Sequence, residues 1–156
     1  MVSVFSGTGR YMAPTQDGTT SNGRAVARWS EGFFETGTIN TSDIREKTEQ
    51  RSADEAEKRV ASALKSGGQF FKWVSAVDKK GDGARWHYGW MAQEIVELFA
   101  AEGLDAHEYG MLCYDEWKDI PESKDEDGEI IQEHRPAGNR YGVRMDQLLA
   151  FIVCNT

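Results

Sequence analysis

The chain has 156 residues, which suits one or two small domains with a modest core, and its formal net charge is −8. Residues 1–41 are neutral overall, while nine acidic residues outnumber two lysines between Asp115 and Glu133, so a surface that attracts nucleic-acid phosphates is excluded there. We see no signal peptide, no membrane-spanning apolar run, and only two cysteines without metal-ligand spacing, so we expect a soluble protein that needs no metal, cofactor, nucleic acid or membrane.

Residues 1–41 are rich in Gly, Thr and Ser and show no helical period. Short apolar runs separated by glycine and polar residues predict three strands, at residues 2–5, 25–29 and 32–34. So small a segment has little to bury by itself. We therefore expect it to be the β-rich end of a longer stalk, with the rest of that stalk upstream of this chain.

Helical and strand patterns alternate after this segment. Ser52 and Glu55 have the spacing of a capping box, and Gly67 follows the apolar positions of the helix that they would open. Residues 69–77 and 85–90 predict the two strands of a hairpin. A second helix is predicted from the apolar spacing between Met91 and Gly103.

The last third of the chain predicts two strand-like arms and a closing helix. The arms are residues 108–117 and 129–134, on either side of a turn-rich acidic stretch at residues 121–128. The acids in this stretch are contiguous rather than alternate, so a solvated hairpin tip is favoured over an EF-hand calcium loop. Because strands and helices interleave without regular βαβ units, the predicted fold class is α+β. The closing helix carries one apolar stripe, formed by Met145, Leu148, Leu149 and Ile152.

Three ordered stretches carry a family resemblance: residues 36–47, with Ser42 and Lys47 five positions apart, then residues 89–94 and residues 141–150. Together they resemble the self-cleaving intramolecular chaperone domain at the C-terminus of phage endosialidases, tail spikes, tail fibres and neck appendages. The resemblance covers roughly residues 36–156.

This resemblance implies a homotrimer that promotes folding of the preceding fibre or spike and then releases itself. It divides the chain into residues 1–41, the end of the parent fibre, and residues 42–156, the chaperone. Assembly would take place in the host cytoplasm, the parent protein would remain in the virion tail, and the released domain would not. The partners are then two further copies and the upstream part of the same chain.

The resemblance also implies a cut between Thr41 and Ser42 by a Ser42–Lys47 dyad. A serine that follows the scissile bond can attack the preceding carbonyl carbon, and the resulting N-to-O acyl shift gives an ester that water hydrolyses. Lysine can accept the serine proton only when it is neutral, a state that burial between three subunits would favour. Residues five apart diverge in both helices and strands, so the dyad requires a bend between them.

Ordinary structural roles compete with each assignment. Ser42 could be an N-cap, and Lys47 a solvated surface lysine. Asp43 either orders the loop or caps a turn. His87 either assists proton transfer or fills the core. Gln93 either donates hydrogen bonds to the oxyanion or ties down backbone groups as a buried amide.

Two other functions remain open at this level. The first is a trimeric tip of the same fold that has a structural or receptor-binding role and never cuts. The second is the related cleavage domain of a membrane-tethered transcription factor, which ranks last because neither a transmembrane nor a basic DNA-binding segment is present.

Overall fold

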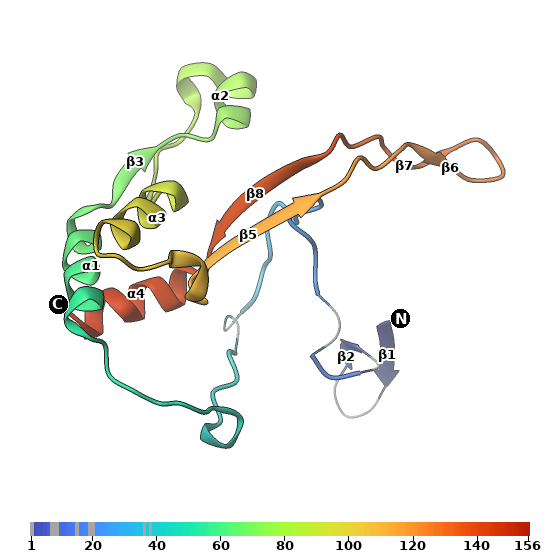
Figure 1. Ribbon diagram of the computed structural model, residues 1–156. Helices are drawn as coiled ribbons and strands as arrows, with labels where there is room; N and C mark the ends of the chain where they lie inside the picture. The colour runs from blue at the N-terminus through green and yellow to red at the C-terminus, as the bar shows by residue number, and fades with distance from the viewer. Residues whose placement is uncertain (1, 7–9, 15, 19–20, 36, 38) are drawn as a thin grey trace. The chain divides into compact units, whose positions relative to one another are not determined.

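The computed structural model describes residues 2–6, 10–14, 16–18, 21–35, 37 and 39–156. The chain divides into two compact units, Met1–Asn40 and Thr41–Thr156 (Figure 1).

The first unit contains one of the three strands predicted for it. The strand predicted at residues 2–5 is confirmed as β1 (Val2–Ser6), which pairs antiparallel with β2 (Arg10–Pro14), a strand that the sequence analysis did not predict. The predictions at residues 25–29 and 32–34 are wrong, because the first lies partly in a turn and the second has no regular structure. An apolar run forms a strand only where a second strand completes its hydrogen-bond ladder, and β1 has such a partner.

The second unit is built on three helices, α1 (Glu55–Ser66), α3 (Ala92–Ala101) and α4 (Met145–Cys154). Helix α1 contacts both α3 and α4, and Figure 1 shows the three together. Their facing side chains form one core with residues of the segment that follows α3: Val60, Leu64, Ile95, Phe99, Ala106, Met111, Leu112, Leu148 and Ile152. The predicted helices are thus confirmed, and burial of these apolar faces is the main source of their stability.

Helix α1 begins two residues later than its predicted capping box. The N-cap is Asp54, whose carboxylate accepts from Glu57 N at 2.9 Å, while the Glu57 carboxylate accepts from Asp54 N at 2.8 Å. The predicted pair, Ser52 and Glu55, has the same spacing, so spacing alone does not separate the two. Gly67 is the C-cap, as predicted.

The predicted hairpin is correct at its base and wrong beyond it. Strands β3 (Gln69–Phe71) and β4 (His87–Gly89) pair antiparallel, but the chain between them forms helix α2 (Val74–Lys80) and the short 3-10 helix η2 (Gly81–Gly83). Two lysines lie in the last turn of α2, and Gly81 follows with φ of 53°. Both features favour a helix end, because lysine complements the carbonyl end of the dipole and glycine tolerates positive φ.

A long two-stranded arm follows the short 3-10 helix η3 (Ala106–Glu108). Its base pairs β5 (Leu112–Trp117) with β8 (Gly138–Val143), and farther out β6 (Ser123–Lys124) pairs with β7 (Ile130–Gln132) (Figure 1). The two predicted arm strands are confirmed with shorter bounds. Strand β8 was not predicted, since its glycines weaken a strand pattern and only pairing with β5 defines it.

The acidic stretch forms the tip of this arm. The Asp125 carboxylate accepts hydrogen bonds from Asp127 N at 3.1 Å and from Glu129 N at 2.9 Å, which closes the turn. The carboxylate therefore satisfies local backbone donors, as in an Asx turn. The hairpin-tip prediction is confirmed.

The apolar stripe predicted on the last helix is divided between two environments. Leu148 is 0% and Ile152 is 5% exposed, and both lie in the core, whereas Met145 is 38% and Leu149 is 44% exposed. Leu148 and Ile152 therefore stabilise the fold of the chain itself, whereas Met145 and Leu149 face away from its core. The combination of helices with small antiparallel sheets is α+β, as predicted. Within the described ranges, no helix is both long and apolar enough to cross a membrane.

Candidate functional site

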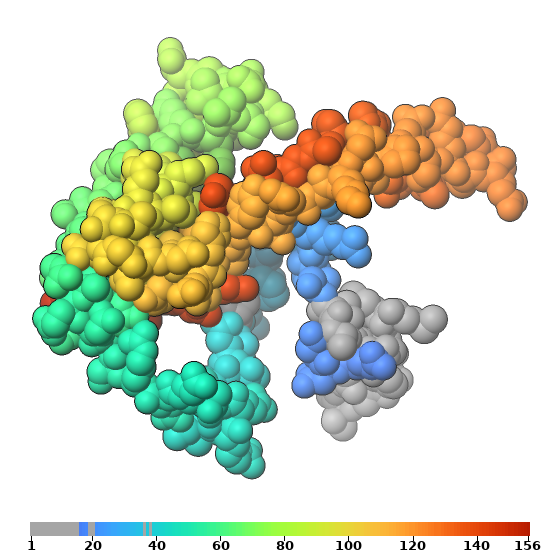
Figure 2. All heavy atoms as spheres, in the orientation of Figure 1, coloured from blue at the N-terminus to red at the C-terminus, as the bar shows by residue number. Residues whose placement is uncertain are grey.

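Ser42 and Lys47 meet in the segment that leads into α1, residues 41–53, which we call the strap. Lys47 Nζ donates a hydrogen bond to Ser42 Oγ at 2.5 Å. Between them lies a single 3-10 turn, η1 (Ile44–Glu46), which supplies the bend that the sequence spacing requires. Both side chains are exposed, and Figure 2 shows the strap as a narrow run of atoms.

The turn that brings the two side chains together is capped by Asp43. Its carboxylate accepts from Arg45 N at 2.9 Å and from the Arg45 guanidinium, whose Nε lies 3.0 Å from Oδ1. These contacts with Arg45 lower the pKa of Asp43, so the cap stays ionised at neutral pH. The exposed Arg45 pair adds little stability, but the cap sets the local path of the chain. Of the two alternatives for Asp43, the capping role is the one observed.

The exposed strap offers neither a shielded base nor an oxyanion donor. Among the described residues, Lys47 is the side chain that forms a hydrogen bond with the Ser42 hydroxyl. An ammonium that remains in water stays hydrated and charged, and serine attack needs a neutral base and donors for the developing oxyanion. A surface that covers the strap would have to remove water from Lys47 and supply the donors for the oxyanion.

His87 and Gln93 lie on other elements than the Ser42–Lys47 pair. His87 is on β4, exposed, with its ring stacked on Phe71 at a centroid distance of 5.7 Å. Gln93 lies in the first turn of α3 and is also exposed. The core-histidine and buried-amide alternatives are therefore wrong. Within the part of the chain that the structure describes, neither residue contacts Ser42 or Lys47.

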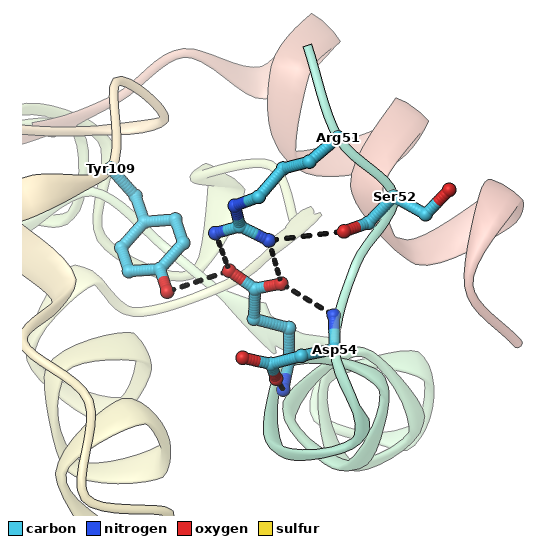
Figure 3. Close-up of polar contacts among 5 residues, drawn as sticks. Arg51, Ser52, Asp54 and Tyr109 are labelled. Atoms are coloured by element: carbon cyan, nitrogen blue, oxygen red, sulfur yellow. Dashed lines mark hydrogen bonds and ion pairs between the residues drawn. The ribbon is translucent and has the colours of Figure 1, made fainter. Parts of the chain in front are cut away.

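One polar cluster was missed by the sequence analysis (Figure 3). Glu57 is 2% exposed, and its carboxylate accepts two bonds from the Arg51 guanidinium, at 2.7 and 2.5 Å. Tyr109 donates its hydroxyl to the same carboxylate at 2.8 Å, and Asp54 N donates at 2.8 Å.

The bond from Arg51 is the main reason that the pKa of Glu57 falls to about 2. Burial, followed by the bond to Glu57, raises the pKa of Tyr109. A signal was present in the sequence, because Glu57 shares the apolar face of α1 with Val60 and Leu64, at spacings of three and seven. An acid on such a face needs a cationic partner.

Known proteins resemble this chain in sequence and in fold. A family model described as the chaperone of endosialidase matches residues 42–104. A crystal structure described as that of a novel intramolecular chaperon is 35% identical, covers 73% of this chain and 93% of its own, and superposes with a TM-score of 0.60. The chain belongs to the endosialidase chaperone family. The resemblance inferred from the three sequence stretches is confirmed.

Other relatives of this chaperone are phage tail proteins. The tail spike protein of Escherichia virus K5 is 40% identical over 88% of this chain, and the side tail fiber protein pb1 of Escherichia phage T5 is 30% identical over 90%. The chain spans 21% and 10% of those two proteins. The carboxy-terminal domain of the bacteriophage T5 L-shaped tail fiber, solved with its intra-molecular chaperone domain, has a TM-score of 0.79 and 30% identity over 94% of this chain and 36% of its own.

The start of the family match coincides with the start of the second unit to within one residue. The match begins at residue 42, and the second compact unit begins at Thr41. The Ser42–Lys47 pair therefore lies at the first residues that the chaperone family shares.

Proposed function

We propose that residues 42–156 trimerise, promote folding of a preceding tail fibre or tail spike, and then cut the chain between Thr41 and Ser42. The observation that carries this proposal is the 2.5 Å contact between Lys47 Nζ and Ser42 Oγ, at the first residue of the family match. The names of the K5 and T5 relatives support a fibre or spike as the upstream partner. Neither nucleic acid nor a membrane enters the proposal.

The bonds that form and break in the proposed cleavage belong to groups of the strap and one water molecule. Neutral Lys47 accepts the proton of Ser42 Oγ as that oxygen attacks the carbonyl carbon of Thr41. The Thr41–Ser42 C–N bond then breaks, and the Ser42 amine receives the proton back from Lys47. The resulting ester between the Thr41 carbonyl and Ser42 Oγ is hydrolysed, which leaves a Thr41 carboxylate and a free Ser42 hydroxyl. Asp43 contributes by capping the turn that aligns the pair.

Assembly would supply what the single chain lacks. Lys47 becomes neutral more readily when a neighbouring subunit removes water from the strap. Exposed apolar side chains suited to such contacts lie along one face of α4, where Met145, Leu149 and Val153 follow at intervals of four, with Val153 73% exposed. Cleavage would then report that three chains have assembled.

A separable trimeric chaperone solves a kinetic problem for a fibre. Three chains must meet in register before interchain contacts can offset the entropy of ordering them. A domain that trimerises at the C-terminal end raises the local concentration of the neighbouring segments. Once the domain is removed after folding, the three chains of the fibre cannot unfold and separate by the route along which they assembled, so the folded fibre is kinetically trapped. Folding and cutting would take place in the host cytoplasm, with the parent protein carried in the virion tail.

Intact mass spectrometry of the expressed chain, with light scattering of the same sample, tests the proposal. Mass spectrometry should detect a fragment that begins at Ser42. Light scattering should give that fragment the mass of a trimer in solution. The exposure of the strap favours one alternative, a trimeric tip of the fibre that does not cut. A trimer that stays intact over days at neutral pH would establish that alternative, and a stable monomer would reject both.

A further inference from the structure

The strap is joined to the rest of its unit by one arginine. Among the described residues, the polar contacts between residues 41–53 and the remainder of Thr41–Thr156 all run through the Arg51 guanidinium, which reaches Glu57. The backbone hydrogen bonds of the strap stay within η1. No sheet or helix therefore fixes this segment before α1 begins.

The group that receives Arg51 is held rigidly from other directions. Glu57 lies on the buried face of α1, accepts from Asp54 N in the capping box, and accepts from Tyr109, which follows η3. With the two guanidinium bonds, the carboxylate accepts four hydrogen bonds, which is close to its full capacity (Figure 3). The fork of arginine matches the two carboxylate oxygens in one orientation, so the contact fixes direction as well as distance.

We propose that Arg51 is a positioning residue for self-cleavage: its attachment to Glu57 anchors the strap to α1 and so keeps the exposed Ser42–Lys47 pair within a limited distance of the chaperone core. This inference rests on the proposed function, because it assigns a task within the cleavage reaction. Arg51 touches none of the reacting atoms. It acts by limiting where Lys47 and Ser42 lie when a covering surface arrives.

The effect of this attachment is set by chain length. Lys47 is four residues from Arg51, so a fixed Arg51 keeps it within about 14 Å of that point. If the contact is lost, the next fixed residue is Asp54, which the capping box holds, and the reach grows to about 25 Å. The effective concentration of the pair near the core then falls by about twofold for a flexible chain, or about fivefold if the chain samples the whole volume. We expect the cleavage rate to fall by the same factor.

A matched pair of arginine substitutions tests this in the full chain. Arg51→Gln removes the attachment of the strap. Arg59→Gln removes an ion pair between α1 and Glu102, with a nitrogen–oxygen distance of 2.7 Å and a side chain 59% exposed, compared with 61% for Arg51. We expect Arg51→Gln to slow formation of the fragment that begins at Ser42 by about two- to fivefold, and Arg59→Gln to leave its rate close to that of the wild-type chain. Arg51→Lys, which keeps the charge but loses the fork, should lie between them.

A measurement on the strap itself does not depend on cleavage. A nitroxide label is attached at Thr48→Cys in a Ser42→Ala chain whose two native cysteines are replaced by serine. We expect Arg51→Gln to sharpen the spectrum of the label, as faster motion requires, and Arg59→Gln to leave it unchanged. Arg51→Lys provides the same measurement if Arg51→Gln does not fold.

Two results would overturn the inference. One is a label spectrum that is unchanged in Arg51→Gln or Arg51→Lys. The other is a cleavage rate that falls equally in Arg51→Gln and Arg59→Gln, in proportion to their melting temperatures, because Arg51 would then act only through stability. If the wild-type chain forms no Ser42 fragment at all, the proposed function fails, whereas the label still decides whether Arg51 holds the strap.

Discussion

Lys47 Nζ lies 2.5 Å from Ser42 Oγ although five positions separate the two residues. In a regular helix or strand these side chains would diverge. They meet because a 3-10 turn, capped by Asp43, reverses the chain between them. The contact is thus a product of local structure, while its chemical environment depends on whatever covers the strap.

Ser42→Ala should abolish the fragment that begins at Ser42, because no oxygen is left to attack the Thr41 carbonyl. Folding and assembly should be unchanged, since the lost hydroxyl is exposed. Ser42→Cys should retain partial cleavage, because sulfur can make the same acyl shift. Electrophoresis and mass spectrometry measure both variants. Normal processing of Ser42→Ala would remove Ser42 from the reaction.

Lys47→Arg should be nearly as damaging as Lys47→Ala. Arginine keeps the positive charge but does not become a neutral base near physiological pH. Single-turnover rates between pH 6 and 9 provide the measurement. Rates close to wild type in Lys47→Arg would show that the residue contributes charge or structure rather than proton transfer.

Two adjacent leucines of α4 should separate folding from assembly. Leu148→Ala should lower the free energy of unfolding by about 2–5 kcal/mol, because Leu148 is 0% exposed in the core. Leu149→Asp should leave the fold intact, since Leu149 is 44% exposed, but should weaken the trimer and slow cleavage. Ala150→Asp, an equal charge at another exposed position of α4, is the control. Circular dichroism and light scattering measure the two effects. A Leu149→Asp monomer that still cuts would uncouple cutting from assembly.

The free energy of unfolding should depend on pH through the ionisation of Glu57. Its folded pKa is about 2, below the ordinary value of 4.5, so ionised Glu57 is favoured in the native state. Its contribution is fully present above about pH 4.5 and is lost as pH falls through about 2. Allowing for the solvent exposure of Arg51, we expect roughly 2 kcal/mol.

Denaturant unfolding of wild type and Glu57→Gln across that range measures this contribution. The difference in free energy of unfolding should be constant near neutral pH and should shrink toward pH 2. Glu55→Gln is the control, because the Glu55 side chain is 80% exposed and pairs only at the surface with Lys58. A difference between wild type and Glu57→Gln that does not change with pH would show that Arg51 does not hold Glu57 ionised.

The sequence by itself determined helices α1, α3 and α4 of the chaperone unit and drew attention to the residues of its candidate site, whereas α2 was predicted as part of a strand. Helices α1, α3 and α4 follow from apolar residues at helical spacing and from glycines beyond the ends of the first two, which are local signals. The pairing of Ser42 with Lys47 was implied by the family resemblance that three ordered stretches carry. Local signals were also enough to predict that a bend must separate the two side chains.

Only the tertiary structure decided which of two equal capping boxes is used, which side chains of α4 are buried, and which strand pairs with β5. Asp54 and Glu57 form the cap, and tertiary contacts also hold Glu57, from Arg51 and from Tyr109, 52 residues away. Leu148 and Leu149 are neighbours with the same side chain, and the packing of α4 against α1 buries the first. These choices depend on contacts between residues distant in the chain, and the free energy of such contacts is not present in any local pattern of residues.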